Sequence, residues 1–435
     1  MKSKTPVILI FDVGRTNKKC LLFDQSLRVV LEQSVSIPDI TDDDGFPAED
    51  LQAISEWLKK MLVFFLDHDE FEVVAINNSA HGAALVHLND QNIPVGNLYN
   101  YLKPFSDALH KLFNLKHGNE MLCARETASP ILGNLNSGMQ LWMIKNQKPE
   151  LFEQIKTSLH LPQYVTWVLA EKKFTDLTSI GCHTMLWDFS KNDYHTWVKL
   201  EQLDKLFPTL SKPDEAALLN YRGRSIPVGP GLHDSSSALL PYLELIHDPF
   251  LLISTGSWNI NLNPFNDEPL TDDELAADCL CFLTPAGKQV KASRLIAGLM
   301  HDEAVRKIAE KYNCADDFFK GIKFDPEFNP GLVDQSAQES LSQAYHRLIF
   351  GLVERQSVSA WLAIGNSGVK KIFVDGGFSK NLIFMNYLVQ AFPDHEIYTT
   401  SLAQASSLGA AMVFRNKLTS NQFDSALLNI KRFGA

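Results

Sequence analysis

Runs of buried-type apolar residues alternate along this chain with short polar or glycine-containing turns. Within the first ninety residues the apolar runs have lengths and spacings typical of strands, and one amphipathic stretch indicates a helix. The expected order is a buried strand from residue 7, strands over 19–23 and 27–35, a helix near 48–66, and strands over 71–77 and 83–88. Strands followed by a helix and further strands are typical of an α/β domain.

The strand-turn-strand pattern of the first residues returns at 250–262. Between the two copies, residues 105–170 are predicted to be mostly helical, and residues 229–240 pass from a Gly/Pro turn into a helix. Later elements are expected as helices over 290–313 and 335–365, a strand over 371–374, and helices over 381–391 and 404–415. The pattern therefore predicts two similar halves, 1–245 and 246–435, joined by a packed hinge.

The first turn has residue types suited to holding a phosphate. Gly14 lets the backbone approach an anion, Thr16 can donate a hydrogen bond, and Lys18 can supply charge. Asp12, at the strand end, could hold Mg²⁺ through water, since Mg²⁺ usually keeps several waters. The predicted phosphate-binding residues are Asp12, Gly14, Arg15, Thr16, Asn17 and Lys18. The alternative is an ordinary β-hairpin with glycine at its turn.

Two later turns repeat this small-residue chemistry. Thr255, Gly256 and Ser257 follow the second buried strand and offer hydroxyls beside a glycine. A third turn precedes the helix at 381–391 and is suited to lie under a flat base or ribose; its predicted nucleotide-binding residues are Gly376, Gly377, Ser379 and Asn381. Taken alone, the third turn is equally consistent with a strand-to-helix loop that needs positive φ.

An acid lies between the two phosphate turns. Asp234 falls where the turn after Gly229 enters a helix, and the helix dipole favours an anion there. An ordinary helix N-cap is the alternative for this residue. Two phosphate turns and one acid in this order indicate transfer of a phosphoryl group from a nucleotide to a hydroxyl, with Asp234 as general base.

Composition narrows the class of protein. The 435 residues carry a net charge of -11, which argues against a nucleic-acid-binding protein. Charged residues make up 21% and apolar residues 45%, so we expect well-packed cores. The six cysteines are scattered, and the spacing of Cys279 and Cys281 does not suit a zinc knuckle. We expect reduced thiols in a cytoplasmic protein with no membrane-spanning segment.

The motifs in this order resemble the FGGY family of carbohydrate kinases over nearly the whole chain. The segments that carry the resemblance are Asp12-x-Gly14-x-Thr16-x-x-Lys19, Gly231-x-His233-Asp234-x-x-Ser237-Ala238, Ser254-Thr255-Gly256-Ser257-Trp258, Gly376-Gly377-x-Ser379-x-Asn381 and Ser407-Leu408-Gly409-Ala410-Ala411. The stretch Asp176-x-Thr178 with Thr184-x-Leu186 also matches.

This resemblance implies an α/β, two-domain fold of the actin/hexokinase/Hsp70 (ribonuclease H-like) type, with the active site in the interdomain cleft. It also implies ATP and Mg²⁺. The first domain would hold the sugar, the catalytic base and the first phosphate turn, and the second domain would hold the second phosphate turn and the adenosine site.

Within the family, two details resemble L-rhamnulose and L-fuculose kinases. They are His233-Asp234 with Ser237 and Ala238 nearby, and Trp258 after the second turn. The resemblance implies a ketose substrate; the predicted sugar contacts are Ser79, His81, Gly82, His233 and Asp234. For His81 a satisfied core histidine is an equal alternative.

Two departures leave other functions open. Arg15 stands where the family has a small or hydroxyl residue, and could grip a phosphate or crowd the pocket. Residues 98–103 lack the acid and arginine that frame the sugar in the family. The alternatives are a kinase of xylulose, ribulose or glycerol, a non-kinase ATPase or chaperone of the superfamily, and a catalytically weakened sugar- and ATP-binding regulatory protein. A homodimer is a further expectation.

Overall fold

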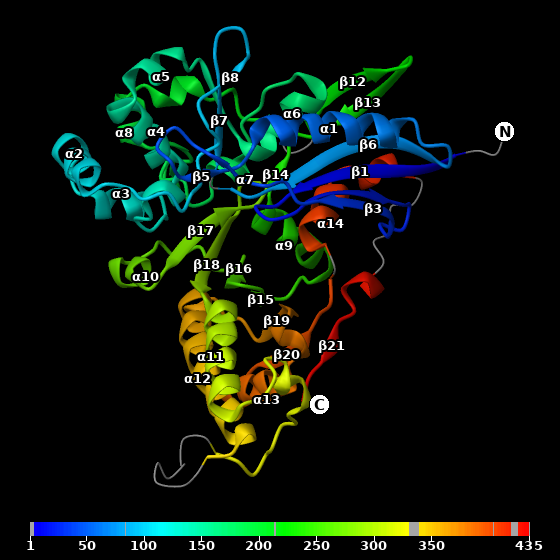
Figure 1. Cartoon of the computed structure of the whole chain (residues 1–435), viewed down its shortest axis with the longest axis vertical. Coiled ribbons are helices and arrows are strands. Elements are labelled where there is room, and N and C mark those ends of the chain that lie inside the picture. The colour runs from blue at the N-terminus through cyan, green and yellow to red at the C-terminus, as the bar shows by residue number, and fades with distance from the viewer. Residues whose placement is uncertain are drawn as a thin grey trace.

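The computed structural model describes residues 4–82, 84–212, 215–329, 339–402, 404–418 and 425–434. Two mixed seven-stranded sheets form its framework (Figure 1). The strands of the first sheet are β1 (Thr5–Val13), β2 (Lys18–Phe23), β3 (Val29–Val35), β6 (Phe71–Ala80), β12 (Ala217–Tyr221), β13 (Arg224–Val228) and β14 (Leu232–His233). Those of the second are β15 (Phe250–Thr255), β16 (Asn259–Asn263), β17 (Cys279–Leu283), β18 (Gln289–Leu295), β19 (Lys371–Gly376), β20 (Glu396–Thr399) and β21 (Lys431–Arg432).

The two sheets share a topology. In the first, β1 pairs antiparallel with β2 and parallel with β6, while β3 extends the antiparallel side. In the second, β15 pairs antiparallel with β16 and parallel with β19, while β18 extends the antiparallel side. This confirms the repeat of the strand-turn-strand pattern. The domain boundary near residue 245 stays a prediction.

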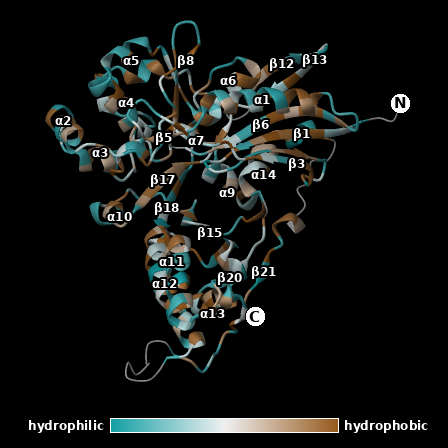
Figure 2. Ribbon diagram, in the orientation of Figure 1, coloured by the Kyte–Doolittle hydropathy of each residue, from teal (hydrophilic) through white to brown (hydrophobic). Residues whose placement is uncertain are grey.

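Alternating side chains of β1 enter two different cores. Val7, Leu9 and Phe11 pack with helices α1 (Leu51–Leu66) and α6 (Leu161–Ala170). Ile8 and Ile10 face the opposite core, which also takes side chains from α9 (Asp234–Leu245) and α14 (Ala405–Met412). Because both faces of the strand are buried, its sequence is a continuous apolar run, and β1 is brown along most of its length in Figure 2.

The last helix, α14, packs against the first sheet although it comes late in the chain. It contacts β1, β6 and α9, and lies beside them in Figure 1. The crossing with α9 is close: a Cβ on Gly409 would come within 1.8 Å of the backbone oxygen of Ser237. The core formed by β1, α9 and α14 therefore packs residues from both ends of the chain together.

The second sheet is covered on one face by three helices, α11 (Ala297–Tyr312), α12 (Leu341–Ile364) and α13 (Leu382–Ala391). Leu251 and Ile253 of β15 pack into that core, while Phe250 and Leu252 enter the core shared with α9 and α14.

Apart from α10, the remaining strands and α-helices belong to the first half. A small sheet combines β7 (Leu85–Leu88), β8 (Pro94–Val95) and β9 (Thr157–His160). The short strands β4 (Ile40–Thr41) and β5 (Pro47–Ala48) pair with each other, as do β10 (Trp187–Asp188) and β11 (Asp193–Tyr194). The other helices are α2 (Asp107–His117), α3 (Glu120–Glu126), α4 (Ser137–Gln147), α5 (Pro149–Gln154), α7 (Leu177–Ile180), α8 (Thr196–Leu200) and α10 (Asp272–Ala276).

Most predicted elements are confirmed within a few residues, and one is wrong at its start. Residues 290–295, expected as helix, belong to strand β18, and α11 begins at Ala297. Pairing of β18 with both β16 and β17 outweighs the helical pattern there. Residues 335–338 of the next predicted helix, and residue 83 of a predicted strand, lie outside the described residues.

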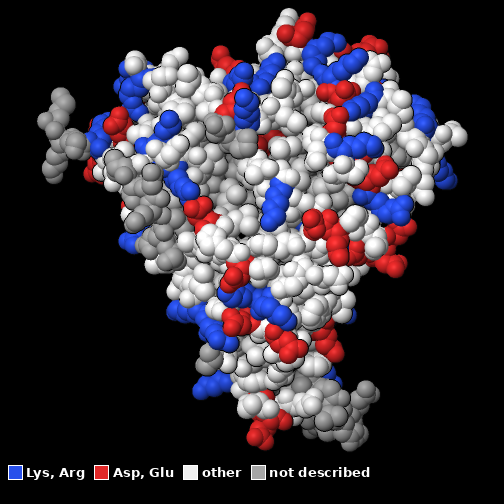
Figure 3. Space-filling model, turned by 180° about the vertical axis from the view of Figure 1, so that it is seen from behind, with Lys and Arg blue, Asp and Glu red and all other residues white. Residues whose placement is uncertain are grey.

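Surface charge is mixed. On the face shown in Figure 3, acidic and basic side chains are interspersed. No helix among the described residues is both long and apolar enough to span a membrane.

We predict that Gly409→Ala destabilises the protein by about 1–3 kcal/mol, because the added methyl group meets the backbone of α9. The matched control is Gly351→Ala in α12, where a Cβ would meet nothing within 4 Å. We expect the control to be neutral or to stabilise by up to about 1 kcal/mol. Urea unfolding measures both variants; equal stability of the two would contradict the close packing of α14 on α9.

Candidate functional site

The predicted site residues of the first half lie at the carboxyl ends of three parallel strands. In the register of the first sheet, Asp12 of β1 is opposite Ser79 of β6, and Ser79 is opposite Leu232 of β14. His233 and Asp234 follow directly, and Asp234 is the first residue of α9. Because β1, β6 and β14 run in the same direction, the sheet brings these side chains to one edge, where open α/β sheets bind ligands.

Asp12 is held by the last helix. Its Oδ2 accepts hydrogen bonds from the hydroxyls of Ser406 (3.0 Å) and Ser407 (2.8 Å), in the first turn of α14. Burial raises the pKa of Asp12, and the negative charge of Asp234 raises it further, whereas the two serine hydrogen bonds lower it by a smaller amount. A cation beside Asp12 would offset both effects, so the site suits a hydrated Mg²⁺.

The two lysines of the first hairpin point to opposite faces of the sheet. Lys19 is opposite Asp12 in the register, and its positive charge acts on that carboxylate. Lys18 is opposite Val13 and lies 1% exposed on the other face. Its Nζ pairs with Glu49 at 2.7 Å and donates to the backbone oxygen of Arg15 at 3.0 Å. In this arrangement Lys18 is a buried ion-pair partner of Glu49, and Lys19 is the lysine whose charge acts on Asp12. The predicted phosphate contact of Lys18 stays a prediction.

The tip of the first turn is open to solvent. Thr16 and Asn17 are exposed, and Gly14 is tightly folded, since a Cβ there would lie 3.1 Å from the backbone oxygen of Asn17. The guanidinium of Arg15 makes a two-point pair with Asp39, at 2.8 and 2.5 Å. The pair directs the Arg15 side chain toward Asp39.

Glu49 links the first hairpin to the predicted sugar site. One carboxylate oxygen accepts from Lys18, and the other lies 2.8 Å from Nε2 of His81. Burial alone would raise the Glu49 pKa, but the hydrogen bonds and charges of His81 and Lys18 outweigh it and lower the pKa to about 2. His81 is thus oriented by a buried ion pair.

Asp234 is half-buried, and its carboxylate is oriented by its neighbours. Oδ1 accepts from the backbone N–H of Ser235 at 2.6 Å and lies 3.2 Å from Nε2 of His233. His233 is buried, and its backbone N–H donates to the hydroxyl of Thr178 at 2.9 Å. Thr178 in turn donates to Asp176, so the Asp176-x-Thr178 stretch fixes the segment that carries Asp234. Gly82 packs against the His233 ring.

Buried polar atoms without a protein partner gather around this acid. Among the described residues, they include Oγ of Ser79, Nδ1 of His81 and both ring nitrogens of His183. Burying such groups unpaired is unfavourable, so a polar ligand would satisfy them.

Sequence reasoning missed several side chains near Asp234. Tyr101 lies with its ring 6.0 Å from that of His81. Burial raises the pKa of Tyr101, the charge of Arg15 opposes that rise, and the charges of Glu49 and Asp234 add to it. Tyr101 belongs to the 98–103 segment noted for lacking an acid and an arginine. Cys182 and His183 were also missed, since neither belongs to a recognisable spacing. Arg294 stacks on Trp258, 5.3 Å from its ring centroid.

The second and third turns are bonded to each other. The hydroxyl of Thr255 donates to the backbone oxygen of Asp375 and accepts from the N–H of Phe378 at 3.0 Å. Gly376 has φ +86°, and a Cβ there would lie 1.9 Å from the backbone oxygen of Thr255, so glycine is required. Thr255 therefore joins the turns, while Gly256, Ser257 and Gly377 are exposed.

Ser379 and Asn381 also have structural partners. The Ser379 hydroxyl donates to the backbone oxygen of Gly376 at 2.7 Å. Asn381 caps α13 by accepting from the N–H of Ile383, and its side-chain amide donates to Tyr345 at 2.8 Å. The nucleotide roles of the two residues stay predictions.

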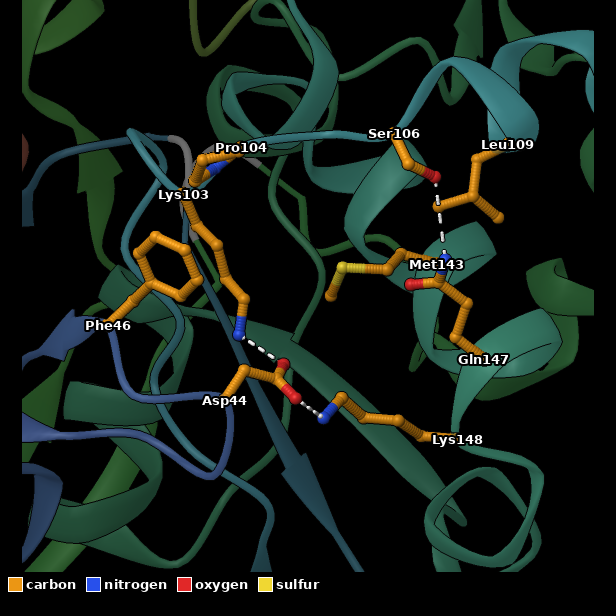
Figure 4. A pocket seen from close by; sticks show the side chains of 9 residues that line it. All are labelled: Asp44, Phe46, Lys103, Pro104, Ser106, Leu109, Met143, Gln147 and Lys148. Atoms are coloured by element: carbon orange, nitrogen blue, oxygen red, sulfur yellow. Dashed lines mark hydrogen bonds and ion pairs between the residues drawn. The ribbon is translucent and has the colours of Figure 1, made fainter.

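A separate cavity of about 240 Å³ lies between α2 and α4, away from these residues (Figure 4). The acidic run Asp42-Asp43-Asp44 is held there by ion pairs with two lysines. Lys103 pairs with Asp42 at 2.6 Å, and Lys148 pairs with Asp43 at 2.7 Å and Asp44 at 2.8 Å. The cationic groups at this cavity are therefore already neutralised.

Comparison with known proteins decides the family. The model of the N-terminal domain of the FGGY family of carbohydrate kinases matches residues 7–240. The chain belongs to the FGGY family of carbohydrate kinases. A gluconokinase of Bacillus licheniformis is 20% identical over 462 aligned positions, which cover 94% of this chain and 87% of that protein.

Solved structures of carbohydrate kinases share the fold. A carbohydrate kinase from Novosphingobium aromaticivorans superposes with TM-score 0.79 at 22% identity, covering 99% of this chain and 94% of that one. A xylulose kinase from Lactobacillus acidophilus gives TM-score 0.80 at 17% identity, covering 98% and 92%. The expected two-domain α/β fold of FGGY kinases is confirmed, and the chain is a sugar kinase that uses ATP.

The contacts of Glu49 with Lys18 and His81 should make the stability of the protein depend on pH. Since the folded pKa of Glu49 is about 2, below its ordinary 4.5, its stabilisation is complete above about pH 4.5 and is lost as pH falls toward 2. We expect Glu49→Gln to cost about 3–5 kcal/mol at pH 7, because it leaves Lys18 buried without a counter-charge.

Urea unfolding between pH 3 and 8 measures the effect. The difference in unfolding free energy between wild type and Glu49→Gln should become smaller below pH 4.5. The exposed Glu56→Gln on α1 is the control and should stay within about 0.5 kcal/mol throughout. A difference that does not change with pH would show that Glu49 is not ionised within a buried pair.

Proposed function

We propose that this kinase transfers the γ-phosphoryl group of MgATP to a hydroxyl of a ketose, L-rhamnulose or L-fuculose, with Asp234 as general base. The observation that carries the proposal is the position of Asp234. It is a half-exposed carboxylate at a helix start, its charge acts on Asp12, and it is next to buried unpaired polar groups.

Asp234 would accept the proton of the attacking hydroxyl. The hydrogen bond from Ser235 N–H keeps one carboxylate oxygen in place, and the neighbouring His233 Nε2 limits its rotation. Burial lowers the pKa of His233, and this effect outweighs the negative charge of Asp234, which raises that pKa. A neutral imidazole can accept or donate one hydrogen bond to a sugar hydroxyl.

The sugar would lie against the ends of β6 and β14. Ser79 and His81 each have a buried polar atom without a partner among the described residues, and Gly82 packs directly against the His233 ring. Such groups fit a compact polyhydroxylated ligand, since each hydroxyl can both donate and accept. Tyr101 would border the same space.

The nucleotide would be held by the exposed turns. When bound, MgATP supplies the phosphoryl group, and Mg²⁺ neutralises charge beside Asp12. Backbone N–H groups at Gly14–Asn17 and that of Ser257 would orient the phosphates, and Lys19 would add charge. The turn at Gly376–Gly377, joined to Thr255, would border the adenosine.

The choice of sugar rests on His233-Asp234 and Trp258, which resemble the rhamnulose and fuculose kinases. Gluconate is the second candidate, because the curated relative is a gluconokinase and a gluconate kinase from Lactobacillus acidophilus has TM-score 0.78 with 18% identity over 99% of this chain and 93% of that one. Xylulose, ribulose and glycerol are the remaining candidate substrates. A weakened regulatory protein would bind ATP and sugar without turnover.

ADP release by the purified protein tests the proposal. We expect it to depend on L-rhamnulose or L-fuculose in a panel that includes gluconate, D-xylulose, L-ribulose and glycerol, and to stop when EDTA removes Mg²⁺. Asp234→Asn should lower kcat about 10²–10⁴-fold, because the general base is lost. The exposed Asp317→Asn is the control and should keep full activity.

An Asp234→Asn variant with kcat within a few-fold of wild type would overturn the assignment of the base. Turnover of gluconate alone would show that the substrate is a sugar acid and not a ketose. Binding of both ATP and a sugar without ADP release would favour the regulatory alternative.

A further inference from the structure

A cluster of one thiol and two imidazoles lies beside the proposed base. The side-chain donor atoms of Cys182, His183 and His233 all lie within 4.8 Å of one another. Cys182 and His183 follow α7, while His233 ends β14, so two distant segments build the cluster. The ring of Phe282 from β17 packs against both imidazoles, with centroids 6.2 and 5.1 Å away.

Within the cluster, His183 has unused binding capacity, whereas Cys182 and His233 each have a hydrogen-bond partner. His183 is 8% exposed, and neither of its ring nitrogens has a hydrogen-bond partner among the described residues. The Cys182 thiol donates to the backbone oxygen of Ser179 at 3.2 Å. An imidazole buried with both nitrogens unpaired is costly, and a ligand that accepts a nitrogen lone pair would remove that cost.

We propose that Cys182, His183 and His233 bind Zn²⁺. Tetrahedral zinc, with Zn–S of about 2.3 Å and Zn–N of about 2.0–2.1 Å, places its ligand atoms about 3.3–3.6 Å apart, so donor atoms that lie within 4.8 Å of one another would move closer together on binding. Asp234, whose Oδ1 lies 3.2 Å from His233 Nε2, can supply the fourth ligand. Binding forms a zinc–sulfur bond and releases the thiol proton of Cys182 to solvent.

The donor set separates this site from the magnesium site. A thiolate with two imidazoles suits zinc, whereas Mg²⁺ prefers carboxylates and water, as at Asp12. A zinc ion here would occupy His233 and Asp234 and so inhibit phosphoryl transfer; this consequence rests on the proposed function.

The other compact clusters among the described residues lack free capacity. In the group Glu126, Asp188 and His195, the imidazole pairs with Glu126 at 2.7 Å and accepts from the N–H of Trp197, while Asp188 pairs with Lys191. The acidic run at 42–44 is neutralised by two lysines. His183 distinguishes the Cys182 cluster from both.

Cobalt substitution tests the site directly, without any need to know the sugar. The full-length protein is stripped with EDTA, dialysed, and titrated with Co²⁺ or Zn²⁺. We expect one metal per chain and a thiolate-to-cobalt charge-transfer band that Zn²⁺ abolishes and excess Mg²⁺ does not. Cys182→Ser should remove the band, and His183→Gln should weaken binding at least 10-fold. Cys281→Ser, a buried thiol outside the cluster, is the control and should match wild type.

Absence of a thiolate band in wild type, or its loss in Cys281→Ser but not in Cys182→Ser, would overturn the site. Circular dichroism verifies that the variants fold, and His183→Gln replaces Cys182→Ser if the latter does not. In the ADP assay, micromolar Zn²⁺ should inhibit wild type, while Cys182→Ser keeps basal activity and resists inhibition. Metal binding without inhibition would retain the site and overturn its regulatory role. If no sugar is turned over, the cobalt band still decides the site.

Discussion

The contact between Asp12 and the last helix is the constraint on which the site depends. Ser406 and Ser407, in the first turn of α14, hold the carboxylate at the end of β1. The Ser237 hydroxyl of α9 donates to the backbone oxygen of Ser406 at 2.6 Å. Because α9 begins at Asp234, the packing of α9 on α14 relates the two acids in space, and the Asp12 contact joins residues from the two ends of the chain.

Buried electrostatics divide the site into distinct chemical regions. Glu49 binds Lys18 away from the proposed phosphate site and orients His81 at the proposed sugar site. Asp12 offers an oxygen ligand at the nucleotide side, while sulfur and nitrogen donors gather at Cys182 and His183. Strand alternation maintains the separation, since neighbouring residues on β2 face opposite cores.

Local patterns predicted most of the fold and part of the site. The apolar runs identified the strands, and the glycine turns identified the loops, because backbone geometry demands those residues locally. The face of the sheet to which a side chain points is harder to predict from sequence. Lys18 and Lys19 are adjacent, and the strand register decides which of the two lies near Asp12. Tyr101 and His183 come from segments that tertiary packing alone brings to Asp234, so no spacing in the sequence reveals them. The homodimer, the cytoplasmic location and the domain boundary stay predictions.

A crystal structure of the complex with an ATP analogue, Mg²⁺ and the sugar is the most direct test. We expect phosphates between the turns at 14–17 and 256–257, Mg²⁺ linked to Asp12 through water, and a sugar hydroxyl about 2.6–3.2 Å from Asp234. A sugar bound away from Asp234, or phosphates held elsewhere than between the two turns, would contradict this expectation.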